Sequence, residues 1–394
     1  MPGTEAEQLK TRVTRAIDSL EERLLEIAGR IHATPELNFE ERFAADLIAT
    51  TAEEAGFTVQ RPLAGLETAF RATHRGSSDS PTVAFLAEYD ALPGIGHACG
   101  HNLIGTASLG AALGLAAAGE DVPGTVQLIG TPAEEGGGGK IILADHGVFE
   151  NVDAALMFHP GNTTELWKEA LASRVLRIEF AGKAAHAASA PEEGVNALDA
   201  TIQTFNGVNA LRQHTRDTAR IHGIITHGGE APNIIPEYSA ALFYVRDLED
   251  DYCEELADRV IECAHGAARA TGSEATVSLD GVYRTLRNNM PLCESFRANL
   301  ERLGWSFDEM RPLRDLGSSD IGNVSHITPC IHPYLRIGPT LLAFHTPGFA
   351  EAAISPEGLR AMVAAAKALA LTAADFFTDE DLRRRVDESF HSGS

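Results

Sequence analysis

The feature that most constrains the fold is a repeated order in the first half of the chain: an apolar β-rich run, a polar cluster, then a helical run. The β-rich runs cover about Val83 to Ala87, Thr125 to Gly130 and Ala154 to Phe158, and the helical runs cover about Ile104 to Ala118 and Lys140 to His146. Strands that alternate with helices are typical of a largely parallel sheet covered by helices on both faces. We therefore predict an α/β fold.

The chain is too long for one domain of the usual size. Its 394 residues exceed the roughly 100 to 200 residues of a typical domain. After the alternating region, the pattern changes to strands paired with two long helices, and an alanine-rich helix begins at Pro356 near the end. We predict a catalytic domain built from residues 1–173 and 288–394, interrupted by a smaller α+β module at 174–287.

Charge and composition narrow the function classes. Asp and Glu number 56 against 32 Lys and Arg, and a net charge of -24 repels a polyphosphate backbone, so we expect no nucleic-acid partner. We find no apolar run of the roughly 18 to 20 residues that span a bilayer and no signal-peptide core, so we expect a cytoplasmic protein without a membrane partner. Five scattered cysteines are typical of reduced thiols.

The densest reactive cluster is Gly-His-Ala-Cys-Gly-His-Asn at residues 96–102. Its three possible metal ligands, His97, Cys99 and His101, lie within five residues. Two other interpretations remain open at this point. The segment can be a surface loop with incidental histidines, or Cys99 can be a nucleophile activated by the flanking imidazoles.

A second cluster pairs the carboxylates of Glu134 and Glu135 at the end of a predicted strand, before four glycines and Lys140. Adjacent carboxylates repel, and a metal can compensate them: one binds the cation while the other acts as general base on a water. A solvated acidic turn is the alternative. A phosphate-binding loop is excluded, because its motif needs Gly at 134 and Ser or Thr at 141, where the chain has Glu134 and Ile141.

Polar residues follow three successive strands. Asp90, the Glu134–Glu135 pair and His159 all fall just past strand ends, which is the edge where open α/β sheets bind ligands. His345, in Phe-His-Thr-Pro, carries little weight by itself. Cys, His and carboxylate donors together suit zinc, and manganese, cobalt and nickel remain alternatives. Neither H-E-x-x-H nor G-x-S-x-G is present.

Eight segments in order resemble the dinuclear aminoacylase and carboxypeptidase type of metallopeptidase, which includes N-acyl-amino-acid amidohydrolases. The resemblance is closest to the branch of p-aminobenzoyl-glutamate hydrolases and β-alanyl-type dipeptidases. It implies two divalent metal ions and hydrolysis of an amide or peptide bond in small N-acyl amino acids or dipeptides. The segments are EYDALPG, GHACGHN, GTPAEEGGGGK, FHP, GKAAHAASAPEEGVNALDA, GGEAPNIIP, FYVRD and FHTP.

The resemblance implies a role for each matching residue in the catalytic domain. Two metal sites share a bridging ligand, Asp90 orients a ligand, and Glu134 is the general base and proton shuttle. The bridge is Cys99, one site is completed by Glu135 and His345, and the other site is completed by His101 and His159.

The resemblance also implies that the inserted module is a lid that forms a homodimer. His186 matches a histidine that reaches the active site of the opposite subunit and polarises the scissile carbonyl. Asn233 and Arg246 match substrate-binding positions, the arginine facing a carboxylate. Purely structural roles remain open for His186 and for Arg246. One departure is Asn102, where the main aminoacylase branch has Asp, so substrate preference does not transfer from that branch.

Two rival functions come from other classes. The first is a non-catalytic binding or scaffold homologue, which would be expected to have lost ligands that are all present here. The second is a cysteine-nucleophile amidase that uses Cys99 with His97 or His101. Only this second rival predicts an activity that survives removal of metal by a chelator.

Overall fold

The computed structural model describes residues 2–119, 122–309 and 316–392 and divides the chain into two compact units. Unit 1 comprises Met1–Glu169, Leu286–Leu316 and Asp320–Ser394, and unit 2 comprises Ala170–Thr285 with Gly317–Ser319. The second unit is therefore an insertion, and the first is assembled from segments that are far apart in the sequence. Each unit has its own hydrophobic core.

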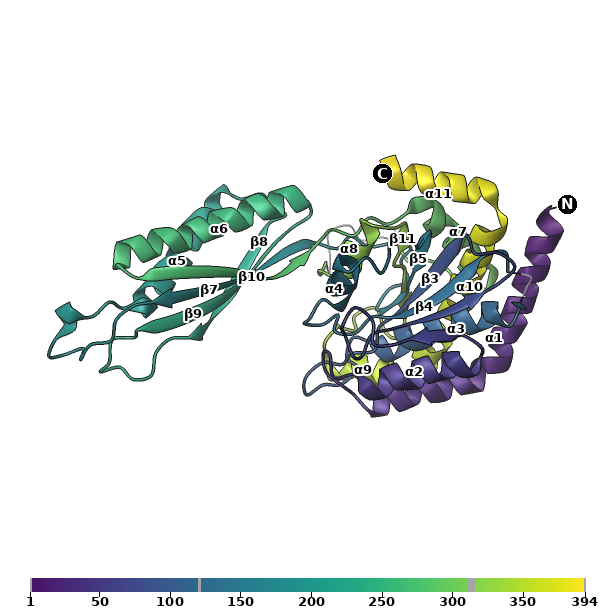
Figure 1. The fold of residues 1–394 in the computed structure, drawn as a ribbon, viewed down its shortest axis with the longest axis horizontal. Helices are drawn as coiled ribbons and strands as arrows, with labels where there is room; N and C mark the ends of the chain where they lie inside the picture. The colour runs from purple at the N-terminus through teal and green to yellow at the C-terminus, as the bar shows by residue number, and fades with distance from the viewer. Residues whose placement is uncertain (1, 120–121, 310–315, 393–394) are drawn as a thin grey trace. The chain divides into compact units, whose positions relative to one another are not determined.

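A six-stranded mixed sheet forms the centre of unit 1 (Figure 1). The four strands β4, β3, β5 and β11 are mutually parallel, while β1 and β2 extend one edge in antiparallel fashion. In sheet order the strands are β1 (Thr58–Gln60), β2 (Phe70–Arg75), β4 (Thr125–Gly130), β3 (Thr82–Ala87), β5 (Ala154–Leu156) and β11 (Cys330–Ile331). A separate parallel pair joins β6 (His159–Gly161) to β12 (Tyr334–Arg336).

Helices cover the sheet of unit 1. Every residue of β3 is buried, as expected for a central parallel strand that is covered on both faces. The helix α3 packs against β3 and β4 and also contacts α1 and α10. The helices are α1 (Pro2–Ala33), α2 (Arg42–Glu54), α3 (His101–Ala116), α4 (Gly139–Asp145), α7 (Met290–Arg302), α8 (Ile321–Ser325), α9 (Pro347–Ala352), α10 (Pro356–Thr378) and α11 (Glu380–Ser392).

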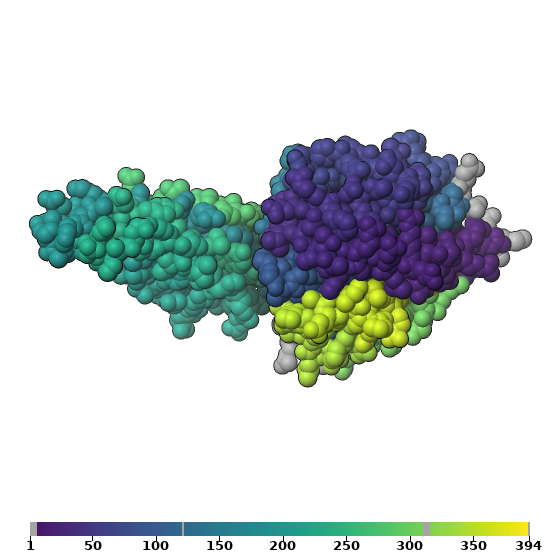
Figure 2. Space-filling view, turned by 90° about the horizontal axis from the view of Figure 1, so that it is seen from below, coloured from purple at the N-terminus to yellow at the C-terminus, as the bar shows by residue number. Residues whose placement is uncertain are grey.

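Helices from the first and the last parts of the chain pack together within unit 1. Figure 2 shows the purple N-terminal part of this unit beside the yellow C-terminal part, and α1 contacts α10. The helix α3 also packs closely on α1, and its glycines permit this approach. A Cβ on Gly114 would lie 2.5 Å from Ile17 Cγ1 of α1. The predicted α/β fold is confirmed, with the difference that two edge strands are antiparallel.

The sequence expectation about apolar runs is wrong for α10. This helix is long and apolar enough, by length and composition alone, to cross a membrane. However, 83% of its most apolar window is buried inside the protein. Its alanines and Leu369 fill the space between α1, α3 and α7, so the apolar composition reflects a core helix.

Unit 2 is a four-stranded antiparallel sheet with two long helices (Figure 1). The strand order is β10, β7, β9, β8, which leaves β8 and β10 as the edges. The helices α5 and α6 pack on one another and on the sheet. The elements are β7 (Ala172–Ala181), α5 (Ala197–Leu211), β8 (Arg220–His227), β9 (Tyr238–Asp247), α6 (Asp250–Thr271) and β10 (Glu274–Tyr283), with short 3-10 turns at Pro191–Glu193 and Arg212–His214.

Candidate metal centre

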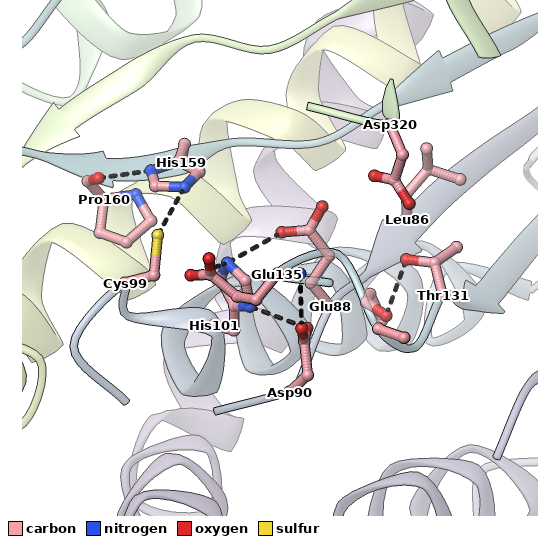
Figure 3. A network of polar contacts seen from close by, with 12 residues as sticks. Leu86, Glu88, Asp90, Cys99, His101, Thr131, Glu135, His159, Pro160 and Asp320 are labelled. Carbon is pink, nitrogen blue, oxygen red and sulfur yellow. Dashed lines mark hydrogen bonds and ion pairs between the residues drawn. The ribbon is translucent and has the colours of Figure 1, made fainter. Parts of the chain in front are cut away.

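The polar residues predicted at the strand ends of unit 1 come together at one edge of its sheet (Figure 3). Asp90 follows β3, the Glu134–Glu135 pair follows β4, and His159 follows β5 as the first residue of β6. Because the parallel strands run in the same direction, their carboxyl ends deliver these side chains to one place. His345 comes from the loop before α9, where its backbone N–H donates to the Ala98 carbonyl oxygen over 3.1 Å.

Cys99, His101 and His159 form a first group whose ligand atoms lie within 4.8 Å of one another. The Cys99 Sγ atom lies 3.5 Å from His159 Nε2, and all three side chains are buried. Gly100 makes this arrangement possible, since its φ is +80° and an added Cβ would lie 2.6 Å from Pro160 Cγ. The glycine thus allows the loop before α3 to approach the residue that follows His159.

Neighbouring oxygens fix how the two histidines of this group are protonated. Asp90 Oδ1 lies 2.9 Å from His101 Nδ1, and the Pro160 carbonyl oxygen lies 2.6 Å from His159 Nδ1. An ionised carboxylate and a carbonyl can only accept, so each Nδ1 donates. Both Nε2 atoms therefore have a lone pair available for a cation when the imidazoles are neutral.

Cys99 also belongs to a second group, with Glu135 and His345. Glu135 Oε1 lies 3.4 Å from His345 Nε2 and 3.9 Å from His101 Nε2, so this oxygen faces both groups. The backbone N–H of Glu135 donates to Asp90 Oδ2 over 2.9 Å. Asp90 thus orients a histidine of one group and the chain that carries the carboxylate of the other.

The donor atoms of these groups fit a pair of divalent ions. His101 Nε2 and Glu135 Oε1 are buried without a hydrogen-bond partner among the described residues, and buried polar atoms are rarely left in that state. Thiolate, imidazole and carboxylate are also the donors that zinc and its neighbours in the first transition row accept. The structure thus brings the five predicted ligands together in two groups that share Cys99.

The surroundings of the centre shift the pKa values of its acidic groups in different directions. Burial, and then the charges of Glu88 and Glu135, hold the pKa of the Glu134 carboxyl well above its usual value. Burial also raises the pKa of the Cys99 thiol, with a further contribution from Glu135. Burial alone would raise the pKa of Asp90, but His101 brings it below its usual value. A dication would favour the charged forms of the first two groups.

The glycine run that follows Glu135 serves close packing. A Cβ on Gly136 would lie 2.4 Å from Asn38 Nδ2, and one on Gly137 would lie 2.2 Å from Phe39 Cε2. Glu41, next to these residues and fully buried, accepts a hydrogen bond of 2.8 Å from the backbone N–H of Ala133. The segment before α2 therefore shapes the loop that carries Glu134 and Glu135.

Three charged residues beside the centre had no predicted role. Lys140 is fully buried, and its Nζ lies 2.5 Å from Glu88 Oε1 and 2.7 Å from Asp320 Oδ1. One signal in the sequence points to Glu88: it is two residues before Asp90, so in an extended segment both side chains share a face. No sequence pattern predicts that Lys140 and Asp320, which are 180 residues apart, pair with each other.

Asn102, the departure from the aminoacylase branch, is explained by its contacts. Its buried amide donates to the carbonyl oxygens of Ala353, over 3.0 Å, and Ala28, over 3.4 Å. An ionised aspartate could not donate to either carbonyl. Asn102 therefore joins α1 and the segment after α9 to α3.

The remaining predicted residues lie in unit 2. His186 Nδ1 accepts hydrogen bonds of 3.2 Å from the backbone N–H groups of Ala188 and Ser189. The Asn233 carbonyl oxygen accepts from the backbone N–H of Ala187, so the structure brings the His186 and Asn233 segments together. Arg246 lies on β9, half-buried, with its guanidinium 5.2 Å from the ring centre of Tyr244. Among the described residues, no hydrogen bond or ion pair joins Arg246 to His186 or Asn233.

The sequence matches one peptidase family and is similar to two individual hydrolases. Residues 84–372 match peptidase family M20/M25/M40. The chain is 41% identical to the Xaa-Arg dipeptidase of Mus musculus, over 99% of this chain and 94% of that protein. It is 35% identical to a subunit of the p-aminobenzoyl-glutamate hydrolase of Escherichia coli, over 75% of this chain and 66% of that protein.

A solved structure shares the fold. It is the YXEP protein of Bacillus subtilis, described as a dinuclear metal binding peptidase from the M20 family. Its TM-score to this chain is 0.70 at 21% sequence identity, covering 92% of this chain and 99% of that one.

Proposed function

Because the chain belongs to peptidase family M20/M25/M40, we propose that it is a metal-dependent amidohydrolase that splits the amide or peptide bond of small dipeptides or N-acyl amino acids. The observation that carries this proposal is the pair of ligand groups that share Cys99, with Glu134 adjacent to both. Cys99 with His101 and His159 would hold one ion, and Cys99 with Glu135 and His345 would hold the other. Zinc is the ion that this donor set favours first.

The residues of the chain supply the proton transfers and the positioning. Two divalent ions, when bound, lower the pKa of a water and polarise the substrate carbonyl. Glu134 takes the proton of the attacking water and returns it to the leaving amine, as general base and then general acid. Asp90 keeps His101 in the orientation that presents Nε2 to the centre. As the family resemblance implies, His186 would polarise the carbonyl in the active site of the opposite subunit of a homodimer, and Asn233 and Arg246 would contact the substrate, the arginine at a carboxylate.

Dipeptides with a carboxy-terminal arginine are the first substrate class that we propose. The support is the identity to the mouse Xaa-Arg dipeptidase over nearly the whole of both chains. The net charge of -24 also favours the approach of a cationic substrate over an anionic one such as an acyl-glutamate. The E. coli relative supplies the contrasting substrate class for a test.

The test begins with chelation. Protein dialysed against a chelator should lose hydrolysis of alanyl-arginine, and added zinc or manganese should restore it, while calcium serves as a control cation. Hydrolysis that persists in metal-free protein would instead support Cys99 as a nucleophile, although burial raises its pKa whereas nucleophilic cysteines have a lowered pKa. A metal-loaded protein that binds dipeptides and hydrolyses none would support a scaffold. A panel of Xaa-Arg, Xaa-Glu and N-acyl substrates then ranks kcat/KM.

A further inference from the structure

A buried row of charges lies next to the two ligand groups. Lys140 forms ion pairs with Glu88 and Asp320, and its backbone N–H also donates to Asp320 Oδ2 over 2.9 Å. All three side chains are fully buried, so none exchanges its partner for water. Figure 3 shows Glu88 between Asp320 and the residues of the metal centre.

The second oxygen of Glu88 is unused. Lys140 holds Oε1, whereas Oε2 is buried without a hydrogen-bond partner among the described residues. Glu88 Oε2 lies 3.5 Å from His101 Nε2, which is also without a hydrogen-bond partner. This separation exceeds that of an ordinary N–H···O bond, and it is close to the 3.4 Å between Glu135 Oε1 and His345 Nε2, two atoms that we assign to one ion.

We propose that Glu88 is a further metal ligand, through Oε2, for the ion held by His101, and that Lys140 and Asp320 are positioning residues that hold Glu88 in place. The buried atoms of Glu88 and His101 that lack a hydrogen-bond partner then share one explanation. The inference rests on the proposed metal-dependent function, because it adds a ligand to that centre.

Lys140 limits Glu88 to one free oxygen. Glu88, Glu134 and Asp320 could together hold a metal ion, since their oxygens lie within 4.8 Å of one another. The Lys140 ammonium instead pairs with two of these three carboxylates. Lys140 is therefore a fixed cation that compensates Asp320 and one side of Glu88, and it leaves only Oε2 to face His101.

The first experiment measures metal binding by Glu88→Gln. The amide oxygen can still accept from Lys140, but the amide nitrogen has no lone pair to offer an ion. We expect wild type to bind two zinc ions, and we expect the variant to bind one of them about 10- to 100-fold more weakly, the range typical for loss of a partner at a metal site. The cobalt(II)-loaded variant should also show an altered d–d absorption spectrum. Asp247→Asn, at a buried carboxylate of unit 2, is the matched control and should change neither quantity.

The outcomes separate the two proposals. Wild type that binds no zinc would refute the metal centre itself. Wild type that binds two ions, with both affinities and the cobalt spectrum unchanged in Glu88→Gln, would overturn only the role of Glu88, which would then lie beside the centre without binding an ion. Should the variant not fold, a crystal structure of zinc-loaded wild type decides: a Glu88 Oε2–zinc distance of about 2.0 to 2.2 Å supports the inference, and a distance beyond about 3 Å overturns it.

A double-mutant cycle tests the positioning role. Lys140→Met should reproduce the altered cobalt spectrum, because Glu88 loses its tether. The variant carrying both Glu88→Gln and Lys140→Met should then bind zinc about as weakly as Glu88→Gln alone, since Lys140 acts through Glu88. If the two losses of affinity multiply instead, Lys140 acts independently of Glu88 and the positioning role is overturned.

Discussion

At the scale of single residues, the two adjacent glutamates of the centre have different environments. Glu135 Oε1 faces His101 and His345, and these histidines lower the pKa of its carboxyl despite burial. Glu134 has a raised pKa, caused first by burial and then by the charges of Glu88 and Glu135. Neighbouring carboxyls with opposite shifts can divide the work, one as a ligand and the other as a proton carrier.

Glu134→Gln should abolish turnover while zinc content stays near two ions per chain. The amide keeps the shape of the side chain but cannot take a proton from water, so we expect kcat to fall by at least about 100-fold, within the range of roughly 10² to 10⁴ for a general base. Elemental analysis and initial rates with an Xaa-Arg dipeptide measure the two quantities. A variant that keeps more than about a hundredth of the wild-type rate would show that another group is the base.

The residues of the centre differ in how far the sequence predicts them. Cys99, His101, Glu134 and Glu135 lie in dense local clusters, and short spacing along the chain is visible without a structure. His345 is recognisable only through a family resemblance, because it lies more than 200 residues from those clusters. Lys140, Asp320 and Glu41 were missed as site residues because tertiary contacts, with no local pattern, bring them to the site.

At the scale of secondary structure elements, α2 and the loop after β4 are joined by a buried carboxyl group. Glu41, immediately before α2, accepts from the Ala133 N–H, and Ala133 has a positive φ of 60°. Burial is the main cause that raises the pKa of Glu41 to about 7, and Asp90 adds to it. The carboxyl therefore holds a proton in the folded protein at pH values where it is ionised in the unfolded chain.

Glu41→Gln should remove a pH dependence of stability. Between about pH 4.5 and 7 the folded protein binds one more proton at Glu41 than the unfolded chain does, so wild-type stability falls as pH rises through this window. We compare the free energy of unfolding of the metal-free Glu41→Gln variant with that of metal-free wild type. This difference should be up to about 3 kcal/mol more favourable to the variant at pH 8 than at pH 4.5. Thermal unfolding across this range measures the change. The control is Glu40→Gln, at the exposed neighbouring residue, which should behave like wild type. If the plots of stability against pH are parallel for all three proteins, the prediction is wrong.

The packing of α3 on α1 depends on a glycine. Gly114→Ala should destabilise the protein by about 1 to 3 kcal/mol, because the new Cβ would lie 2.5 Å from Ile17 Cγ1 and 2.8 Å from Ile17 Cδ1. The double variant that combines Gly114→Ala with Ile17→Ala lacks both of these Ile17 atoms. It should lose less free energy of unfolding than the two single variants lose together. Denaturant unfolding measures these differences. Gly266→Ala on α6 meets no atom within 4 Å and should be neutral or stabilising, and strict additivity at the Ile17–Gly114 pair would exclude the clash.

At the scale of the whole molecule, unit 2 has an exposed apolar strand at one edge of its sheet. The β8 edge of unit 2 exposes Ile224 (62%) and Ile225 (43%), and an edge strand has backbone groups available for pairing with another chain.

The mostly parallel sheet of unit 1 was predictable, because strands and helices alternate locally. The antiparallel edge strands β1 and β2 were not, because the pairing partner of a short strand is chosen by tertiary packing.

We expect a two-fold dimer in which each active site receives His186 from the neighbouring chain. Inactive His186→Ala protein mixed with inactive Glu134→Gln protein should then regain activity after subunit exchange. About half of the dimers are mixed and each has one intact site, so recovery should reach up to roughly a quarter of the wild-type rate. Analytical ultracentrifugation with labelled chains verifies exchange. Exchange without regained activity would place any action of His186 within its own chain.

The position of α10 in the core of unit 1 has a consequence for biosynthesis. This helix covers α1 and α3, yet about 260 residues separate the end of α3 from the end of α10. At the usual 5 to 20 residues per second, a nascent chain waits roughly 10 to 50 s with that apolar face of α1 and α3 uncovered. Unit 2, whose segments are nearly continuous, emerges from the ribosome during this interval and can fold first. The inserted unit can therefore fold on the nascent chain before α10 has been made and can complete the core of unit 1.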